Sequence, residues 1–68
     1  MNRYSIEYKR EYFSISSTIE AYNKADAANA GSIFLRNDSL VPDMIKTDIT
    51  AKTIIVKRIY KSKRDGGL

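Results

Sequence analysis

Two alternating runs of apolar and polar residues constrain this fold more than any other feature of the chain. In the first run Tyr4, Ile6 and Tyr8 alternate with polar residues, the period of a half-buried strand. In the second run the apolar residues move to odd positions, beginning with Phe13 and Ile15. Strands of opposite parity share one apolar face when a loop of even length joins them as an antiparallel hairpin. The sequence therefore predicts an N-terminal hairpin.

The turn of this hairpin sets its register. A two-residue turn at residues 10–11 has the required even length, but neither Arg nor Glu favours the positive φ of tight hairpin turns. A four-residue loop over residues 9–12 is the alternative, and it keeps the same strand pairing. The expected pairs are Tyr8 with Phe13, Ile6 with Ile15 and Tyr4 with Ser17.

A helix is predicted over residues 24–36. Asn23 has the character of an N-cap, and Asp26 places a negative charge in the first turn. Asn37 and the polar residues after it end the helix. Small residues come first on the expected buried face and large ones last, so the first half of the helix can approach a sheet closely. This face comprises Ala27, Ala28, Gly31, Phe34 and Leu35.

The second half of the chain ends in a strong strand pattern. Pro42 interrupts regular structure, and a single helical turn at 43–45 fits after it. Residues 45–52 stay open, because their weak alternation also fits a short strand. Residues 53–61 have the highest β-propensity in the chain. The expected fold is a two-layer α+β domain of residues 1–64 with a flexible tail at 65–68. Its order is β-β-α-β-β, with an antiparallel sheet of three to four strands and one helix on one face.

Composition narrows the function classes. The chain has 68 residues, no cysteine and no histidine, so disulfides, thiolate or imidazole metal sites, thiol nucleophiles and histidine bases are unavailable. The glycines form no phosphate-binding loop, and the carboxylates have no calcium-loop spacing. We expect no enzymatic activity, no cofactor and no metal. Without a signal peptide or membrane span, a soluble cytoplasmic protein is expected. Because a domain this small buries only about 60% of its unfolded surface, homodimerisation is one route to stability.

The positive charge lies in the C-terminal part. Residues 1–40 hold five Lys/Arg and five Asp/Glu, whereas residues 41–68 hold seven and three, which gives the whole formal charge of +4. Two interpretations fit: an edge strand guarded against aggregation by cations, and a docking patch for an anionic partner. The cations divide between two strand faces and gather at one end, which favours a local patch. The predicted partner-binding residues are Lys57, Arg58, Tyr60, Lys61, Lys63, Arg64, Tyr12 and Tyr22.

With residues 4–8 (YSIEY), 19–28 (IEAYNKADAA) and 54–59 (IIVKRI), the layout resembles that of many small proteins encoded by phages and mobile elements. Among these are anti-CRISPR proteins that pack a short antiparallel sheet around one helix. The resemblance covers nearly the whole chain and is one of architecture. It implies a non-enzymatic inhibitor that binds a bacterial protein or nucleoprotein complex.

Three hypotheses remain open from the sequence. The first is a binding protein that docks its sheet face and basic end on a host complex. The second is a direct DNA or RNA binder that sets the same cations against phosphates, although a net charge of +4 with eight acids is modest for that role. The third is a structural or oligomerisation module that uses its unpaired strand edges.

Overall fold

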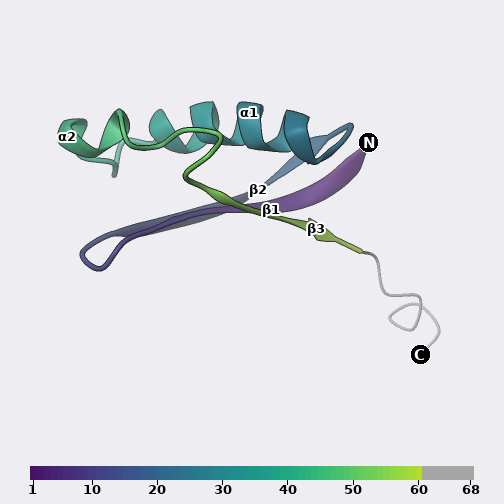
Figure 1. Ribbon diagram of the computed structural model, residues 1–68, viewed down its shortest axis with the longest axis horizontal. Coiled ribbons are helices and arrows are strands. Elements are labelled where there is room, and N and C mark those ends of the chain that lie inside the picture. The colour runs from purple at the N-terminus through teal and green to yellow at the C-terminus, as the bar shows by residue number, and fades with distance from the viewer. Residues whose placement is uncertain (61–68) are drawn as a thin grey trace.

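Three antiparallel strands and two helices form the part of the chain, residues 1–60, that the computed structural model describes. The sheet has the order β2-β1-β3, with β1 at Asn2–Lys9, β2 at Ser14–Ala21 and β3 at Ile55–Ile59. Helix α1, Lys24–Arg36, lies over one face of the sheet, and the short helix α2, Asp43–Lys46, follows it (Figure 1). The predicted α+β class with a helix on one face is confirmed.

The end of the predicted domain at residue 64 and the predicted tail at 65–68 lie outside the described residues. Within residues 1–60, neither helix combines the length and the apolar character that crossing a membrane requires.

The predicted hairpin forms, but its register differs by two residues from the prediction. Tyr8 lies opposite Ile15, and Ile6 lies opposite Ser17. The loop has four residues, 10–13, and it is closed by a 2.8 Å hydrogen bond that the backbone N–H of Arg10 donates to the carbonyl of Phe13. The loop therefore starts one residue later than the four-residue alternative, which was expected over residues 9–12. Because its length is even, the apolar residues of both strands still share the helix side of the sheet.

Helix α1 has the predicted boundaries and the predicted cap. The side chain of Asn23 accepts a 2.8 Å hydrogen bond from the backbone N–H of Asp26, which satisfies one of the free donors of the first turn. At the other end the N–H of Asn37 donates to the carbonyl of Ile33 at 3.1 Å. The local sequence thus fixes both ends of the helix.

The close approach of helix and sheet is also confirmed. Ala27, Gly31 and Leu35 are buried and follow one stripe of α1. A Cβ atom added to Gly31 would lie only 2.8 Å from Cγ2 of Ile6, a fully buried residue of β1. Only glycine fits at this point without displacing the strand.

The prediction that Phe34 lies on the buried face of the helix is wrong. Its side chain is 54% exposed, and the buried stripe of α1 turns toward Ser32 instead, which is 5% exposed. The hydroxyl of Ser32 donates to the carbonyl of Asn29 at 2.9 Å, so this polar group is satisfied within the helix. A serine that bonds its own helix needs no further partner in the core.

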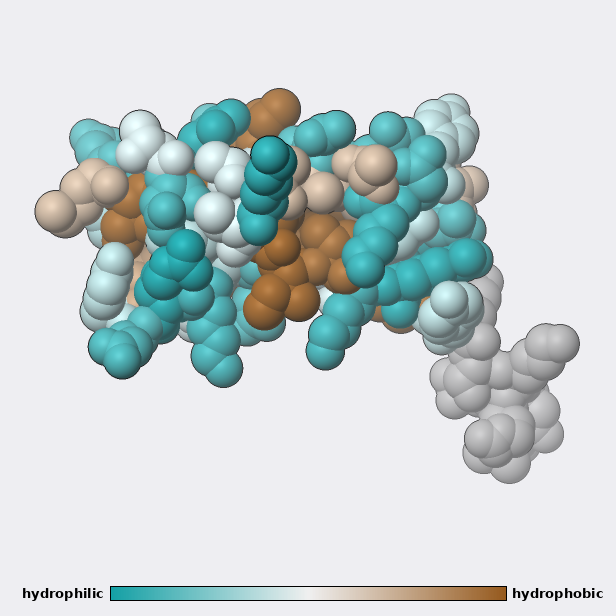
Figure 2. All heavy atoms as spheres, viewed as in Figure 1, coloured by the Kyte–Doolittle hydropathy of each residue, from teal (hydrophilic) through white to brown (hydrophobic). Residues whose placement is uncertain are grey.

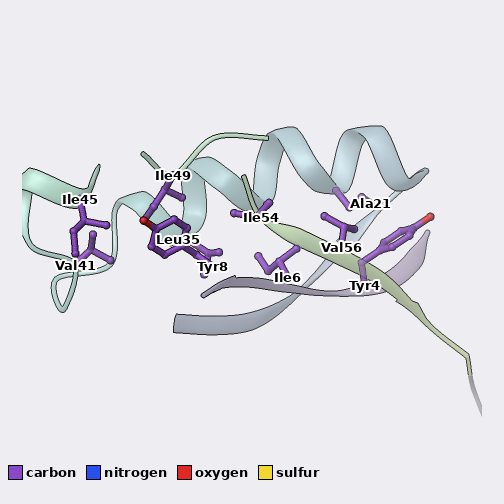
Figure 3. Packing of buried hydrophobic residues seen from close by; sticks show 11 residues of the cluster. Tyr4, Ile6, Tyr8, Ala21, Leu35, Val41, Ile45, Ile49, Ile54 and Val56 are labelled. Carbon is purple, nitrogen blue, oxygen red and sulfur yellow. The ribbon is translucent and has the colours of Figure 1, made fainter. Parts of the chain in front are cut away.

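The core lies between α1 and the helix-facing side of the sheet (Figure 3). Tyr8, Ile6, Leu35 and Ile49 are its largest fully enclosed side chains. Phe13, Ile15, Ile19 and Ala28 pack against it while remaining partly exposed. The full cluster is Tyr4, Ile6, Tyr8, Ala21, Ala27, Leu35, Val41, Ile45, Ile49, Ile54 and Val56.

Residues 45–52 form no strand, so the β-β-α-β-β order with a fourth strand becomes β-β-α-α-β. The predicted helical turn after Pro42 is present as α2. Backbone hydrogen bonds between residues three apart continue the helical turn beyond α2. The N–H of Asp48 donates to the carbonyl of Ile45 at 2.8 Å, and the N–H of Ile49 donates to the carbonyl of Lys46 at 3.2 Å. Ile45 and Ile49 are four residues apart and both buried, which is helical rather than strand spacing.

Substitution of Gly31 by alanine tests the helix–sheet contact. Helix propensity alone favours alanine by up to about 1 kcal/mol. The clash with Ile6 should outweigh that gain, because overpacking a core costs about 1–3 kcal/mol. Urea denaturation should therefore show a lower free energy of unfolding for Gly31→Ala. Asn29→Ala, at an exposed position of the same helix, is the control and should be neutral or stabilising. A Gly31→Ala variant more stable than the wild type would contradict the contact.

Candidate protein interface

Strand β3 carries the predicted binding residues and lies at the edge of the sheet. Among residues 1–60 it pairs with β1 alone. It is shorter than predicted, and its apolar residues divide between two faces as expected. Ile54, just before the strand, and Val56 are buried at 8% exposure, whereas Ile55 and Ile59 remain 46% and 40% exposed on the open face. The strand is thus anchored by one side and presents apolar surface on the other.

A shallow groove runs beside the beginning of β3. It lies between β3 and the first turns of α1, where small side chains leave space next to the strand. Figure 2 shows hydrophobic side chains gathered at the beginning of β3 and framed by hydrophilic ones. The lining residues are Lys24, Ala25, Ala28, Ala51, Ile54, Ile55 and Val56.

The basic end of β3 is organised around Arg58. Its guanidinium lies 4.8 Å from the centre of the Tyr60 ring and donates a 2.9 Å hydrogen bond to the side chain of Asn2. The Asn2 amide in turn donates to the carbonyl of Tyr22 at 3.3 Å. The side chain of Lys57 lies on the opposite face of the strand. The backbone carbonyl of Lys57 accepts a 3.5 Å hydrogen bond from the Ser5 hydroxyl.

The structure therefore brings together some of the predicted site residues and separates others. Arg58, Tyr60 and Tyr22 meet at one end of the sheet, with both tyrosines more than 70% exposed. Tyr12 lies in the hairpin loop at the opposite end of β1 and is not part of this group. Lys61, Lys63 and Arg64 lie outside the described residues.

Four exposed cations that form no ion pair within residues 1–60 lie in the groove, next to it in the chain, or further along β3. The three ion pairs within residues 1–60 join Arg3 to Glu20, Arg10 to Asp48 and Lys46 to Asp43. None of them involves Lys24, Lys52, Lys57 or Arg58, and no acidic residue lines the groove. Lys24 is part of the lining, and Lys52 follows Ala51 in the chain. The groove is therefore mainly apolar, with Lys24 in its lining, and Lys57 and Arg58 follow its last lining residue, Val56, along β3.

A second cluster of charged groups lies at the other end of the sheet. The hydroxyl of the buried Tyr8 donates to the carboxylate of Asp48 at 2.5 Å, and Arg10 donates to the same oxygen at 2.8 Å while lying over the Tyr8 ring. The hydrogen bond from Tyr8 lowers the pKa of Asp48 below its ordinary value, and the charge of Arg10 adds to that effect. The hydrogen bond to Asp48 is the main cause that raises the pKa of Tyr8, and burial of its hydroxyl is the second.

This cluster ties the hairpin to the segment between α2 and β3. The phenol ring is enclosed by the core, so its hydroxyl is committed to Asp48. In the sequence the carboxylates showed only that they have no calcium-loop spacing, and this role of Asp48 was not predicted. The inward parity of Tyr8 indicated that a buried hydroxyl needed a partner, but nothing in the sequence identified which acid would supply it.

The alanines of the groove were likewise missed as site residues. Ala28 was expected on the buried face of α1, and it is only partly buried because it borders the groove. The small residues of the first helical turns were the available signal. Their effect on the surface depends on where β3 lies relative to α1, which only the tertiary structure gives.

Comparison of the chain with protein-family models, with curated proteins and with solved structures finds no match. The candidate interface therefore rests on its own geometry: an edge strand, an apolar groove beside it, and cations on β3 and in the groove that form no ion pair within the described part of the chain.

The Tyr8–Asp48 bond should give the fold a specific dependence on pH. Because the pKa of Asp48 is depressed in the folded state, its contribution to stability is present above the ordinary value of 3.8 and is lost as the pH falls below it. Asp48→Asn keeps the shape of the side chain and removes the charge. Urea denaturation at about pH 6 and about pH 3 should show a smaller acid-induced loss of stability for this variant than for the wild type.

The control for that experiment is Asp43→Asn, since the Asp43 side chain is 99% exposed. It should reproduce the wild-type difference between the two pH values. If Asp48→Asn and the wild type lose the same amount of stability at acid pH, the Tyr8–Asp48 hydrogen bond does not have this role.

Proposed function

We propose that this chain is a small non-enzymatic binding protein that docks on another protein or nucleoprotein complex and acts stoichiometrically. The observation that carries the proposal is an apolar groove beside the edge strand β3, with Lys24, Lys57 and Arg58 forming no ion pair and no second strand pairing with β3 within residues 1–60. Apolar area supplies the affinity of such a contact, and the rim of positive charge supplies orientation and a faster encounter with an acidic partner.

The docking surface is centred on β3 rather than on the middle of the open face of the sheet. That open face is mostly polar, with Ser5, Ser16 and Thr18 at its centre. Glu7 and Glu20 lie on the same face as Lys57. Where this face reaches β3, it carries the exposed Ile55 and Ile59 on either side of Lys57, and no acid of residues 1–60 forms an ion pair with this lysine.

The distribution of acids also favours a protein contact over a direct nucleic-acid contact. A phosphate backbone requires a row of cations, and two carboxylates interrupt the face that would present Lys57. Under this proposal the partner is a bacterial host complex in the cytoplasm, as the resemblance to phage-encoded inhibitors implies. Contact with the nucleic acid of such a complex is secondary to contact with its protein.

Charge reversal at the basic end of β3 tests the docking surface. The double variant Lys57→Glu with Arg58→Glu should lose the partner that the wild type cross-links in a bacterial extract, because it places two carboxylates on a surface that selects acidic groups. The matched control, Lys9→Glu with Lys46→Glu, makes the same change of charge away from β3 and should keep the partner. Thermal unfolding followed by circular dichroism checks that both variants fold.

Two results would overturn the proposal. One is an unchanged set of cross-linked proteins for the Lys57/Arg58 variant. The other is tight binding of the purified protein to an oligonucleotide, with log K falling by about 0.9 per phosphate contact as log salt rises. That salt dependence would identify a direct DNA or RNA binder.

A further inference from the structure

The two edges of the sheet differ in how open they are to an additional strand. On the open face the outer strand β2 presents Ser14, Ser16, Thr18 and Glu20, a run of polar side chains. The other outer strand, β3, has Ile55, Lys57 and Ile59 on that face and the groove on the other, so it offers more apolar surface than β2 and a single cation on the open face. Polar and charged edges discourage pairing, whereas an apolar edge favours it. The edge of β3 is the better template.

The backbone of β3 has the groups that strand addition needs. In an antiparallel pair, alternate residues of an edge strand direct their N–H and C=O groups away from the neighbouring strand. Strand β3 spans five residues, which corresponds to an edge of about 17 Å. Within residues 1–60 no other strand uses it.

The side-chain environment on each side of this edge defines what an added strand would carry. On the helix side, Ala25, Ala28 and Ala51 leave room next to Ile54 and Val56 for β-branched apolar side chains. On the open side, Lys57 lies between two exposed isoleucines and forms no ion pair with an acid of residues 1–60. Since successive side chains of a strand point to opposite faces, an added strand would place apolar residues toward α1 and carboxylates beside Lys57.

A second copy of the chain is disfavoured in the register that covers the whole of β3. The symmetric antiparallel pairing that matches Ile55 with Ile59 of the other copy sets Lys57 directly opposite the same lysine. Like charges in directly opposite positions destabilise a pair of strands. Neither the groove nor β3 contains an acid that could compensate.

We propose that the partner contributes an extended segment of alternating apolar and acidic residues, which adds to β3 as a fourth strand of the sheet. This rests on the proposed docking function and names the chemistry of its partner. Main-chain hydrogen bonds to β3 provide the affinity, and the groove and Lys57 select the alternate side chains.

The probe is a blocked synthetic peptide of about nine residues in which valine and glutamate alternate, long enough to cover the edge of β3. Amide spectra of the full chain should shift at residues 54–59 and at the first turns of α1, and alternate amides of β3 should gain protection from hydrogen exchange. Two control peptides should bind at least about tenfold more weakly, one with lysine in place of glutamate and one with a central proline that removes a ladder donor.

Two variants locate the contact. Ala25→Glu places a charge in the groove and should weaken the valine–glutamate peptide, whereas Ala30→Glu, also at an exposed position of α1, should not. Lys57→Glu should reverse the preference, so that the lysine peptide binds more tightly than the glutamate peptide. Such a reversal cannot come from a general loss of folding.

The proposal is wrong if the β3 amides do not shift at millimolar peptide, if the proline peptide binds equally well, or if the shifts map to β2. It is also wrong if light scattering finds a dimer whose β3 amides are already protected, because a second copy then holds the edge. These failures differ from failure of the docking function. If strand addition fails while the Lys57/Arg58 double variant still loses the natural partner, docking stands and only its mode is refuted.

Discussion

The contact between Gly31 and Ile6 sets the distance between the helix and the sheet, and the rest of the structure depends on it. With no Cβ at residue 31, α1 lies directly on the central strand β1. The alanines of the first helical turns extend this close approach toward β3, and the groove is the space they leave there. The packing that stabilises the core therefore also shapes the candidate interface. A larger residue at 31 would lift the helix and change both.

Local sequence patterns predicted the elements of this fold better than their pairing. The hairpin, the capped helix and the C-terminal strand follow from alternation, from Asn23 and from β-branched residues. The register of the hairpin does not follow from these patterns, because the turn has no Gly or Asn to fix its position. Phe13 also packs against the core from within the loop instead of from the second strand. Phe34 is exposed, against expectation, because the close contact of Gly31 with the sheet sets the orientation of α1 and turns Ser32 rather than Phe34 toward the core.

The candidate site was predictable in its charge and not in its shape. The sequence located the cations of β3 and their division between two faces, which the positions of Lys57 and Arg58 confirm. It could not show which cations lack acidic neighbours, since that depends on tertiary contacts such as the one between Arg10 and Asp48. For the same reason the groove could not be predicted, because its two walls come from separate segments of the chain, residues 24–28 and residues 51–56.

The strand order β2-β1-β3 also has a consequence for how the chain folds during synthesis. The central strand β1 is made early, yet one of its two neighbours is completed only at Ile59. Until then the hairpin and α1 can assemble, but the edge of β1 that β3 later covers stays unpaired. Pairings this distant in sequence form slowly, and open edges in partly folded chains lead to aggregation. The newly made protein thus passes through a stage in which a different edge, with Ile6 at its centre, is the one exposed to other chains.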